Sequence, residues 1–130
     1  MATIPAEFQE LFQKKAFAHL ATVDEKCIPQ VTPVWVDFDG EYVLVNSAKG
    51  RKKDRNIRAN PWVALSIQDP DNPYRYLGIQ GRVEAIVEER AVEHIHALSR
   101  KYTGQDFGFL TEDQVRVIYK IRPERVWTNA

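Results

Sequence analysis

The sequence contains little sulfur: its 130 residues include one cysteine, Cys27, and one methionine. A single cysteine excludes an internal disulfide and any metal site built from several cysteines. No hydrophobic run approaches the roughly 20 residues that a membrane-spanning helix needs. The N-terminus also lacks the basic and then apolar order of a secretory signal peptide. From these absences we expect a soluble, cytoplasmic protein with no membrane partner.

Charge is balanced over the whole chain but not along it. The 18 basic and 18 acidic residues give a formal net charge of zero, which argues against a general coat for nucleic acid. Residues 49–58, however, hold six basic residues and one acidic residue. Such a small, dense positive segment suits a small anion better than a long polyanion.

Length and composition indicate one globular domain over residues 1–130. The hydrophobic fraction of 44% and the charged fraction of 28% are those of a folded protein. A chain of this length can bury one substantial core but not two.

Hydrophobic periodicity predicts six strands and three helices. Apolar residues at positions 8, 11 and 12 favour a helix over 4–15, and the Asp39-Gly40 pair favours a hairpin. Pro33 marks an edge strand or a bulge, because it cannot donate to a ladder. Gly104 is expected to end a helix in the left-handed conformation. The expected strands are 16–23, 28–38, 41–47, 62–68, 74–87 and 115–127, the other helices are 51–59 and 88–102, and 69–73 is a loop.

This order of elements predicts an α+β fold that is mainly β. Most strands follow one another through short turns, which is typical of antiparallel sheets. Long strands in so short a chain favour a small closed or half-closed barrel with peripheral helices.

The segment N-S-A-K-G-R-K-K at 46–53 carries the strongest chemical signal. The first turn of a helix normally prefers acids, because its free N–H groups already present positive potential. Here Arg51, Lys52 and Lys53 occupy that turn, which an anion would explain. A phosphate could accept hydrogen bonds from Ser47, from turn amides and from these cations. A solvated basic helix face is the alternative, and the order of residues is not that of a nucleotide-hydrolysing glycine loop.

The histidines do not indicate a metal site. His94 and His96 lie two residues apart on a predicted helix, so their side chains point about 200° apart. We expect one of them at the surface and the other partly packed. His19, within an apolar strand, is expected to be a hydrogen-bonded core residue.

Several segments resemble the pyridoxamine 5′-phosphate oxidase-like split-barrel flavoproteins. The pattern N-S-x-K-G-R-K-x-x-x-N-I-R-x-N-P at 46–61 is similar to the family's phosphate segment. The segments A-H-L-A-T-V at 18–23, P-x-x-T-P-V-W at 29–35 and G-R-V-E at 81–84 are similar as well. The likeness covers nearly the whole chain in the family's order. The doubled basic start of the helix is most similar to the subgroup that binds the deazaflavin coenzyme F420 rather than FMN.

This resemblance implies a six-stranded antiparallel split β-barrel that acts as a homodimer, with cofactor sites at the subunit interface. It also implies an oxidoreductase that transfers a hydride between F420, or alternatively FMN, and a small unsaturated organic substrate. No catalytic residue and no metal are implied. The cofactor-binding residues implied are Thr32, Pro33, Val34 and Trp35 beside the ring; Asn46, Ser47, Lys49, Arg51, Lys52 and Lys53 in the phosphate segment; Arg55 and Asn56 near the ribityl chain or anionic tail; and Trp127, approaching from the partner subunit.

The chain also departs from the vitamin-salvage oxidase of this family. That enzyme holds the phosphate of its substrate with an arginine-containing C-terminal segment, whereas this chain ends three residues after Trp127. We therefore do not expect pyridoxamine phosphate to be the substrate. The alternative function is a non-catalytic binding or carrier protein of the same fold, for a flavin, a deazaflavin or a haem-related molecule.

Overall fold

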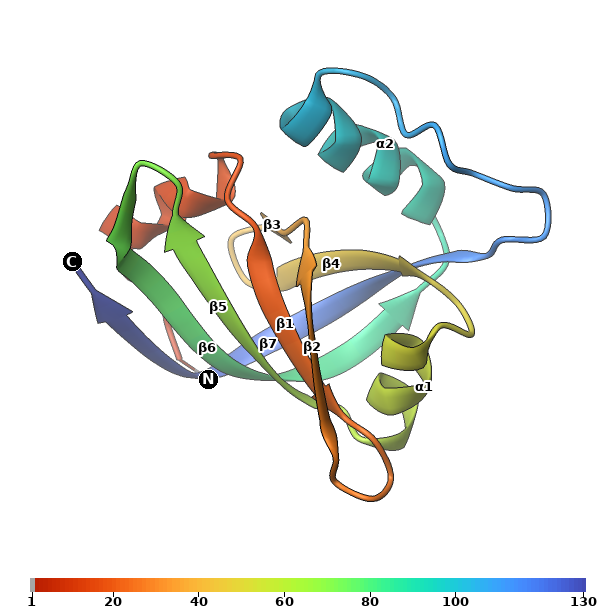
Figure 1. The fold of residues 1–130 in the computed structure, drawn as a ribbon, viewed down its shortest axis with the longest axis horizontal. Coiled ribbons are helices and arrows are strands. Elements are labelled where there is room, and N and C mark those ends of the chain that lie inside the picture. The colour runs from red at the N-terminus through yellow and green to blue at the C-terminus, as the bar shows by residue number, and fades with distance from the viewer. Residues whose placement is uncertain (1) are drawn as a thin grey trace.

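A computed structural model describes residues 2–130, which form one antiparallel sheet with helices at its margins (Figure 1). The elements, in chain order, are the 3₁₀-helix η1 (Ala6–Phe12), β1 (Ala18–Val23), β2 (Pro29–Val34), β3 (Asp37–Phe38), β4 (Val43–Ala48), α1 (Lys52–Ala59), β5 (Trp62–Asp69), β6 (Asn72–Val87), α2 (Ala91–Thr103) and β7 (Arg116–Asn129).

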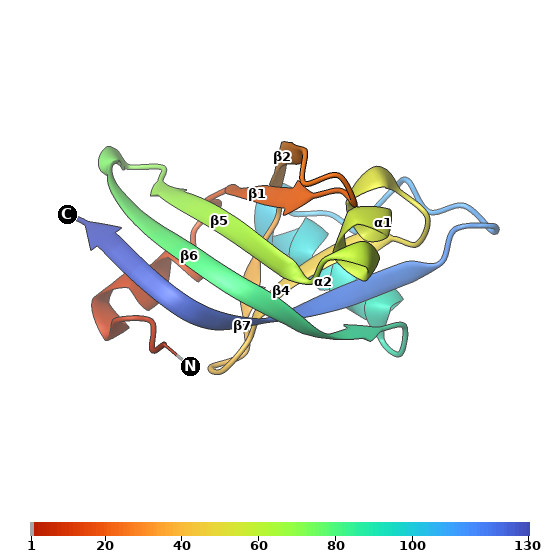
Figure 2. The same cartoon turned by 90° about the horizontal axis from the view of Figure 1, so that it is seen from below.

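The strands pair in the order β2-β1-β5-β6-β7-β4-β3, and every neighbouring pair is antiparallel. The sheet curls into a half-barrel, with the long strands β6 and β7 through its middle (Figure 2). The register between these two strands shifts next to Gly81, where an added Cβ would lie 2.7 Å from the Cγ2 atom of Ile121. The expected antiparallel, mainly β split barrel is therefore confirmed.

The prediction of six strands is wrong by one, because the expected strand 28–38 is interrupted. β2 pairs with β1 at one edge of the sheet, whereas β3 pairs with β4 at the other edge. Between them, the Val36 amide donates to the Tyr102 hydroxyl at 3.2 Å and the Val36 carbonyl accepts from Lys101 Nζ at 2.6 Å. Side chains of α2 thus replace a strand partner there. Pro33 lies in the edge strand β2, as its missing N–H predicts.

The core fills the concave side of the sheet. In β5, residues Val63, Leu65 and Ile67 are buried while their neighbours in sequence are more exposed, which is the period-two pattern of a strand. Full burial of each such side chain contributes about 1.5–3 kcal/mol. The apolar face predicted for residues 4–15 is confirmed, but the helix is the shorter 3₁₀-helix η1, and it packs against this core.

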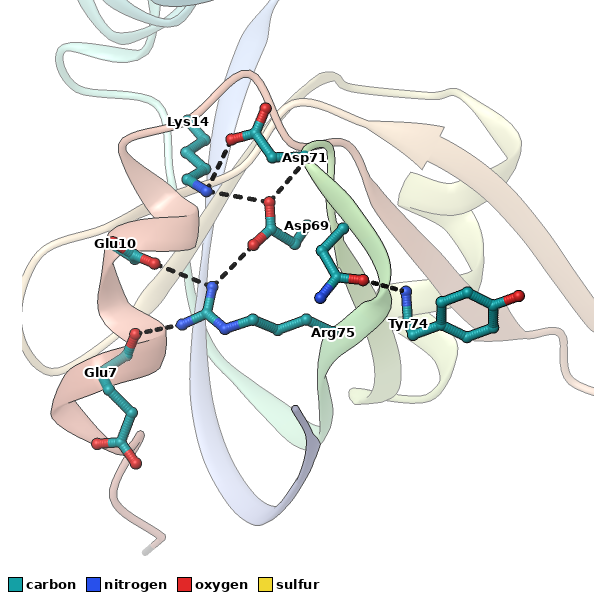
Figure 3. A network of polar contacts seen from close by, with 8 residues as sticks. Glu7, Glu10, Lys14, Asp69, Asp71, Tyr74 and Arg75 are labelled. Carbon is teal, nitrogen blue, oxygen red and sulfur yellow. Dashed lines mark hydrogen bonds and ion pairs between the residues drawn. The ribbon is translucent and has the colours of Figure 1, made fainter.

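The predicted loop 69–73 is instead a tight hairpin between β5 and β6, and it is tied to the N-terminal segment (Figure 3). Asp69 accepts from Lys14 Nζ at 3.0 Å and from Arg75 Nη1 at 2.9 Å. The amide of Asp71, together with Lys14 and Arg75, outweighs burial and lowers the pKa of Asp69 to about 2. Side chains distant in sequence therefore stabilise the turn.

Both α-helices lie near their expected positions. Gly104 ends α2 with a φ of 82°, as predicted. The apolar stripe of α2 buries Ile95, Leu98 and Tyr102, whereas Val92, which fits the same spacing, is 44% exposed. No helix among residues 2–130 is both long enough and apolar enough to cross a membrane.

The expectation for His19 is wrong. Its side chain projects from β1 on the outer face of the sheet and is exposed. The neighbouring residues Ala18 and Leu20 point inward and are 0% and 1% exposed. A one-residue offset along a strand exchanges core and solvent faces, so the apolar neighbours of His19 do not imply its burial.

Candidate anion-binding site

A short turn joins β4 to α1 and sets the direction of the basic residues. Gly50 adopts a φ of 92° and Arg51 is the extended residue before the helix. The Asp54 carboxylate accepts from the Gly50 amide at 2.9 Å, from the Tyr119 hydroxyl at 2.7 Å and from Arg58 Nε at 2.9 Å. Burial alone would raise the pKa of Asp54, but these hydrogen bonds outweigh it and lower the pKa. The buried Asp54 carboxylate therefore holds the turn that joins β4 to α1, from which the basic side chains project.

The start of α1 faces a groove of about 210 Å³ that also receives residues from β2, β4, α2 and β7. We call it the cationic groove, because Arg51, Lys53 and Arg116 converge in it. Its lining residues are Phe17, Pro33, Val34, Trp35, Asn46, Arg51, Lys53, Ile95, Leu98, Phe107 and Arg116.

The cations of this groove have no acidic partner among the residues that the structure describes. Arg116 is 5% exposed, and Asn46 Oδ1 accepts from its Nε at 2.9 Å and its Nη2 at 2.7 Å. Burial, followed by the repulsion of Arg51, lowers the pKa of Arg116 to about 10. Burial, Arg51 and Arg116 also lower the pKa of Lys53. In the described part of the chain, no carboxylate forms an ion pair with Arg51, Lys53 or Arg116. Of the three, Arg116 is buried, Lys53 is half-buried and Arg51 is exposed. Because a buried cation is normally paired with an acid, Arg116 is the residue that most favours a bound anion.

One flank of the cationic groove is aromatic. The Trp35 ring stacks on Tyr102, with ring centroids 5.3 Å apart and planes 13° apart. Phe107 meets Trp35 edge-on at 6.2 Å, and the Arg116 guanidinium carbon lies 5.2 Å from the centre of the Phe107 ring. The groove thus combines an aromatic surface with positively charged side chains, which suits a ligand that has both a ring and an anionic group.

A second cavity, of about 430 Å³, lies on another side of α1. Lys52, Arg55 and Asn56 of α1 line it, and the β1–β2 turn contributes Lys26 together with the two acids Asp24 and Glu25. Successive helix residues point about 100° apart, and this rotation separates Lys52 from Lys53. The cations of α1 therefore do not form one cluster.

The structure brings only some of the predicted site residues together. Pro33, Val34, Trp35, Asn46, Arg51 and Lys53 line the cationic groove, and Lys52, Arg55 and Asn56 line the second cavity.

Four predicted residues line neither cavity. Ser47 is 1% exposed and points into the barrel core. Thr32 stays on the edge strand β2, and Lys49 is exposed, with its Nζ 3.8 Å from Glu88. Trp127 lies at the far end of β7 from Arg116, with its indole against Gly78.

Sequence reasoning missed five of the residues that line the cationic groove. Phe17, Ile95, Leu98 and Phe107 are apolar and carry no distinguishing signal in the sequence. Arg116 does carry a distinguishing signal in the sequence, because it is a basic residue at the start of a strand that is otherwise rich in buried apolar residues. Its place beside the phosphate segment depends on the pairing of β7 with β4, which sets Arg116 opposite Ala48.

The histidines of α2 take part in packing. His94 Nε2 lies 3.3 Å from Asp37, and His96 Nδ1 accepts from the Phe107 amide at 3.0 Å. Both rings are partly buried, so the expectation that one would be at the surface is wrong. Within residues 2–130, no group of three or more His, Cys, Asp or Glu side chains is placed to hold a metal ion.

Comparison with proteins of known structure finds similar folds over almost the whole chain. A structure described as an F420 reductase is 38% identical, covers 95% of this chain and 98% of its own, and superposes with a TM-score of 0.85. A conserved hypothetical protein from Mycobacterium tuberculosis is 24% identical with a TM-score of 0.75, over 99% of this chain and 86% of its own, which shows a shared fold.

Sequence comparison indicates the same family. A pyridoxamine 5′-phosphate oxidase homolog from Saccharomyces cerevisiae is 29% identical over 80 residues, which are 52% of this chain and 40% of the yeast protein. The family model described as pyridoxamine 5′-phosphate oxidase matches residues 4–130. Together with the half-barrel fold, this match shows that the chain belongs to the pyridoxamine 5′-phosphate oxidase family.

Proposed function

We propose that this protein binds coenzyme F420, in preference to FMN, and uses it to oxidise or reduce a small unsaturated organic molecule. The observation that supports this most strongly is the cationic groove, where Arg51, Lys53 and Arg116 have no acidic partner among residues 2–130 and lie beside aromatic side chains. A phosphate on a ring system satisfies both features. The likeness to an F420 reductase over almost the whole chain supports the choice of cofactor.

In this proposal the residues of the groove hold and orient the cofactor. Arg116, Lys53 and Arg51 bind its phosphate through charge-assisted hydrogen bonds. Phe17 and Pro33 line both the cationic groove and a neighbouring cavity of about 380 Å³, which offers room for the ring. The bound deazaflavin ring supplies the hydride chemistry. The protein contributes position, electrostatics and shielding from water, and no side chain needs to act as a covalent nucleophile.

The second cavity favours F420 over FMN. FMN ends at its phosphate, whereas a deazaflavin of this type carries a further anionic tail. Lys52 and Arg55, with Lys26 from the β1–β2 turn, place three cations around a space of about 430 Å³ next to the start of α1, and they outnumber the two carboxylates that also line it, Asp24 and Glu25. We assign this cavity to the tail.

The outer face of the sheet is proposed to bind a second copy of the chain. Val31 is 63% exposed, Trp62 is 50% exposed and Trp127 is 40% exposed. Trp62 also borders a shallow cavity of about 340 Å³ with Ala21, Ala64 and others. Exposed apolar patches of this kind mark interaction surfaces. Pairing through this face would form a homodimer and let the partner's Trp127 approach the ring.

Cofactor titration tests the proposal. Purified protein is titrated with F420 and with FMN, and binding is followed by the absorbance and fluorescence of each cofactor. Replacing Arg51 and Lys53 together by Ala should weaken F420 binding by several kcal/mol, since each charge-assisted contact contributes about 1.5–3 kcal/mol. Arg122→Ala is the matched control, because Arg122 is ion-paired with Glu84 away from the groove.

Three results would count against parts of the proposal. Equal F420 affinity of the double variant and the wild type would remove the cationic groove as the phosphate site. F420 binding without turnover of any tested acceptor would favour a carrier protein over an enzyme. A monomeric mass in light scattering at micromolar concentration would contradict the homodimer.

A further inference from the structure

A chain of polar contacts leads from the protein surface to the cationic groove. Asp37 Oδ2 lies 3.3 Å from His94 Nε2, and His94 Nδ1 lies 3.1 Å from Asn46 Nδ2. Asn46 Nδ2 also donates to the Ala91 carbonyl at 2.8 Å, and Asn46 Oδ1 accepts twice from Arg116. The chain joins β3, α2, β4 and β7, and the proposed function assigns a task only to its last member, Arg116.

The directions of these hydrogen bonds follow from the chemistry of the groups. A guanidinium can only donate, so the oxygen of the Asn46 amide must face Arg116. The NH2 group of Asn46 then faces both the Ala91 carbonyl and His94 Nδ1. Since an amide NH2 group cannot accept, His94 Nδ1 must be the unprotonated nitrogen. The ring proton of neutral His94 is therefore on Nε2, directed toward the Asp37 carboxylate.

Asn46 is the main anchor of Arg116. The only other hydrogen bond from Arg116 to a side chain goes to Gln114 at 3.3 Å, within the described residues. Arg51 and Lys53 share the groove with Arg116, and their charges repel the guanidinium. If the Asn46 amide turned over, its NH2 group would face the donors of Arg116 and the anchor would be lost.

We propose that His94 is a positioning residue: by accepting from Asn46 alongside the Ala91 carbonyl, it strengthens the one amide orientation that aims Arg116 into the cationic groove. The inference deepens the proposed function, because the value of an aimed Arg116 rests on an anion binding there. The Asp37 carboxylate lies 3.3 Å from His94 Nε2, where its negative charge favours a proton on that nitrogen and leaves Nδ1 free to accept. Such support of one binding residue by another is the usual way in which sites are held in working geometry.

Affinity for F420 in a double-mutant cycle tests the inference. His94→Phe keeps the ring but removes the acceptor, and we expect about tenfold weaker F420 binding, the effect of roughly 1.4 kcal/mol. His94→Asn places an amide oxygen near the position of Nδ1, so its affinity should stay within about threefold of wild type. In an Asn46→Ala background, His94→Phe should have no further effect, because the residue through which His94 acts is gone.

A purely structural role for His94 gives a different pattern. His94→Phe and Asn46→Ala would then weaken binding additively, and His94→Asn would be as impaired as His94→Phe. Either result overturns the inference, as does unchanged affinity of His94→Phe. Thermal unfolding of each variant shows whether it is folded at the temperature of the titration.

Nitrogen NMR of the wild type tests the same inference without a ligand and without a variant. In the neutral form of the His94 ring, we expect the proton on Nε2 and a bare Nδ1. A proton on Nδ1 would overturn the inference whether or not F420 binds. Failure of the wild type to bind F420 or FMN, combined with the expected tautomer, would instead overturn the proposed function and leave the His94–Asn46–Arg116 geometry supported.

Discussion

Replacing Arg116 by Met should stabilise the fold while impairing the site. The pKa of Arg116 is about 10 against an ordinary value of 12.5, so the fold disfavours its charged form by about 3 kcal/mol. Met has a similar length and no charge, and it removes this cost. Asn46 Oδ1 then loses its donor, which costs about 2 kcal/mol. We therefore expect the free energy of unfolding to rise by about 1 kcal/mol, as in other replacements of buried charges by apolar residues.

Urea unfolding followed by tryptophan fluorescence, at one fixed protein concentration, measures this change. F420 should stabilise the wild type in proportion to the logarithm of its concentration above Kd, and this stabilisation should shrink strongly in Arg116→Met. Arg122→Met is the control: it removes an ion-paired arginine from the same strand and should leave the effect of F420 unchanged. A fall of 2 kcal/mol or more in the unfolding free energy of Arg116→Met would refute the reasoning, because it would mean that the fold itself needs the charge.

Further predictions concern the supports of the site and the outer face. Asp54→Asn should lower the free energy of unfolding by about 3 kcal/mol in urea titrations, because the buried carboxylate bonds to Tyr119 and to the turn before α1. The pKa of Asp69 is lowered to about 2, so its contribution to stability is complete above about pH 4 and disappears as the pH falls toward 2. Acid titration of Asp69→Asn should lack that loss. Gly78→Ala would set a Cβ 2.2 Å from the Trp127 indole, so we expect a displaced ring, detected as a shift in its fluorescence emission.

Features set by local chemistry could be predicted from the sequence. The Asp39-Gly40 turn forms as expected: Gly40 has a φ of 100°, and Asp39 Oδ1 accepts from the Glu41 and Tyr42 amides. Gly104 caps α2 and the short basic helix ends before Pro61. In each case a residue two to four positions away supplies the deciding contact.

Features set by distant contacts could not be predicted. The break between β2 and β3 depends on Lys101 and Tyr102, which lie some 65 residues further along the chain. The role of Arg116 depends on the pairing of β7 with β4. The separation of Lys52 from Lys53 depends on what surrounds each side of α1. A pattern of basic residues predicts that an anion binds near a helix start, but tertiary contacts decide which cations share it.

The eight-residue helix α1 has a consequence for ligand choice. Lys53 lines the cationic groove on one side of the helix and Lys52 lines the second cavity on another side. A ligand whose only anionic group is one phosphate therefore contacts only one of these two lysines. A ligand with several carboxylates beyond its phosphate can extend around the N-terminus of α1 and contact Lys53 and Lys52 at the same time. The binding affinity for such a ligand should then increase with each added carboxylate until the second cavity is occupied, and further carboxylates should have no effect. The length of α1 would thereby determine the length of anionic tail that the protein prefers.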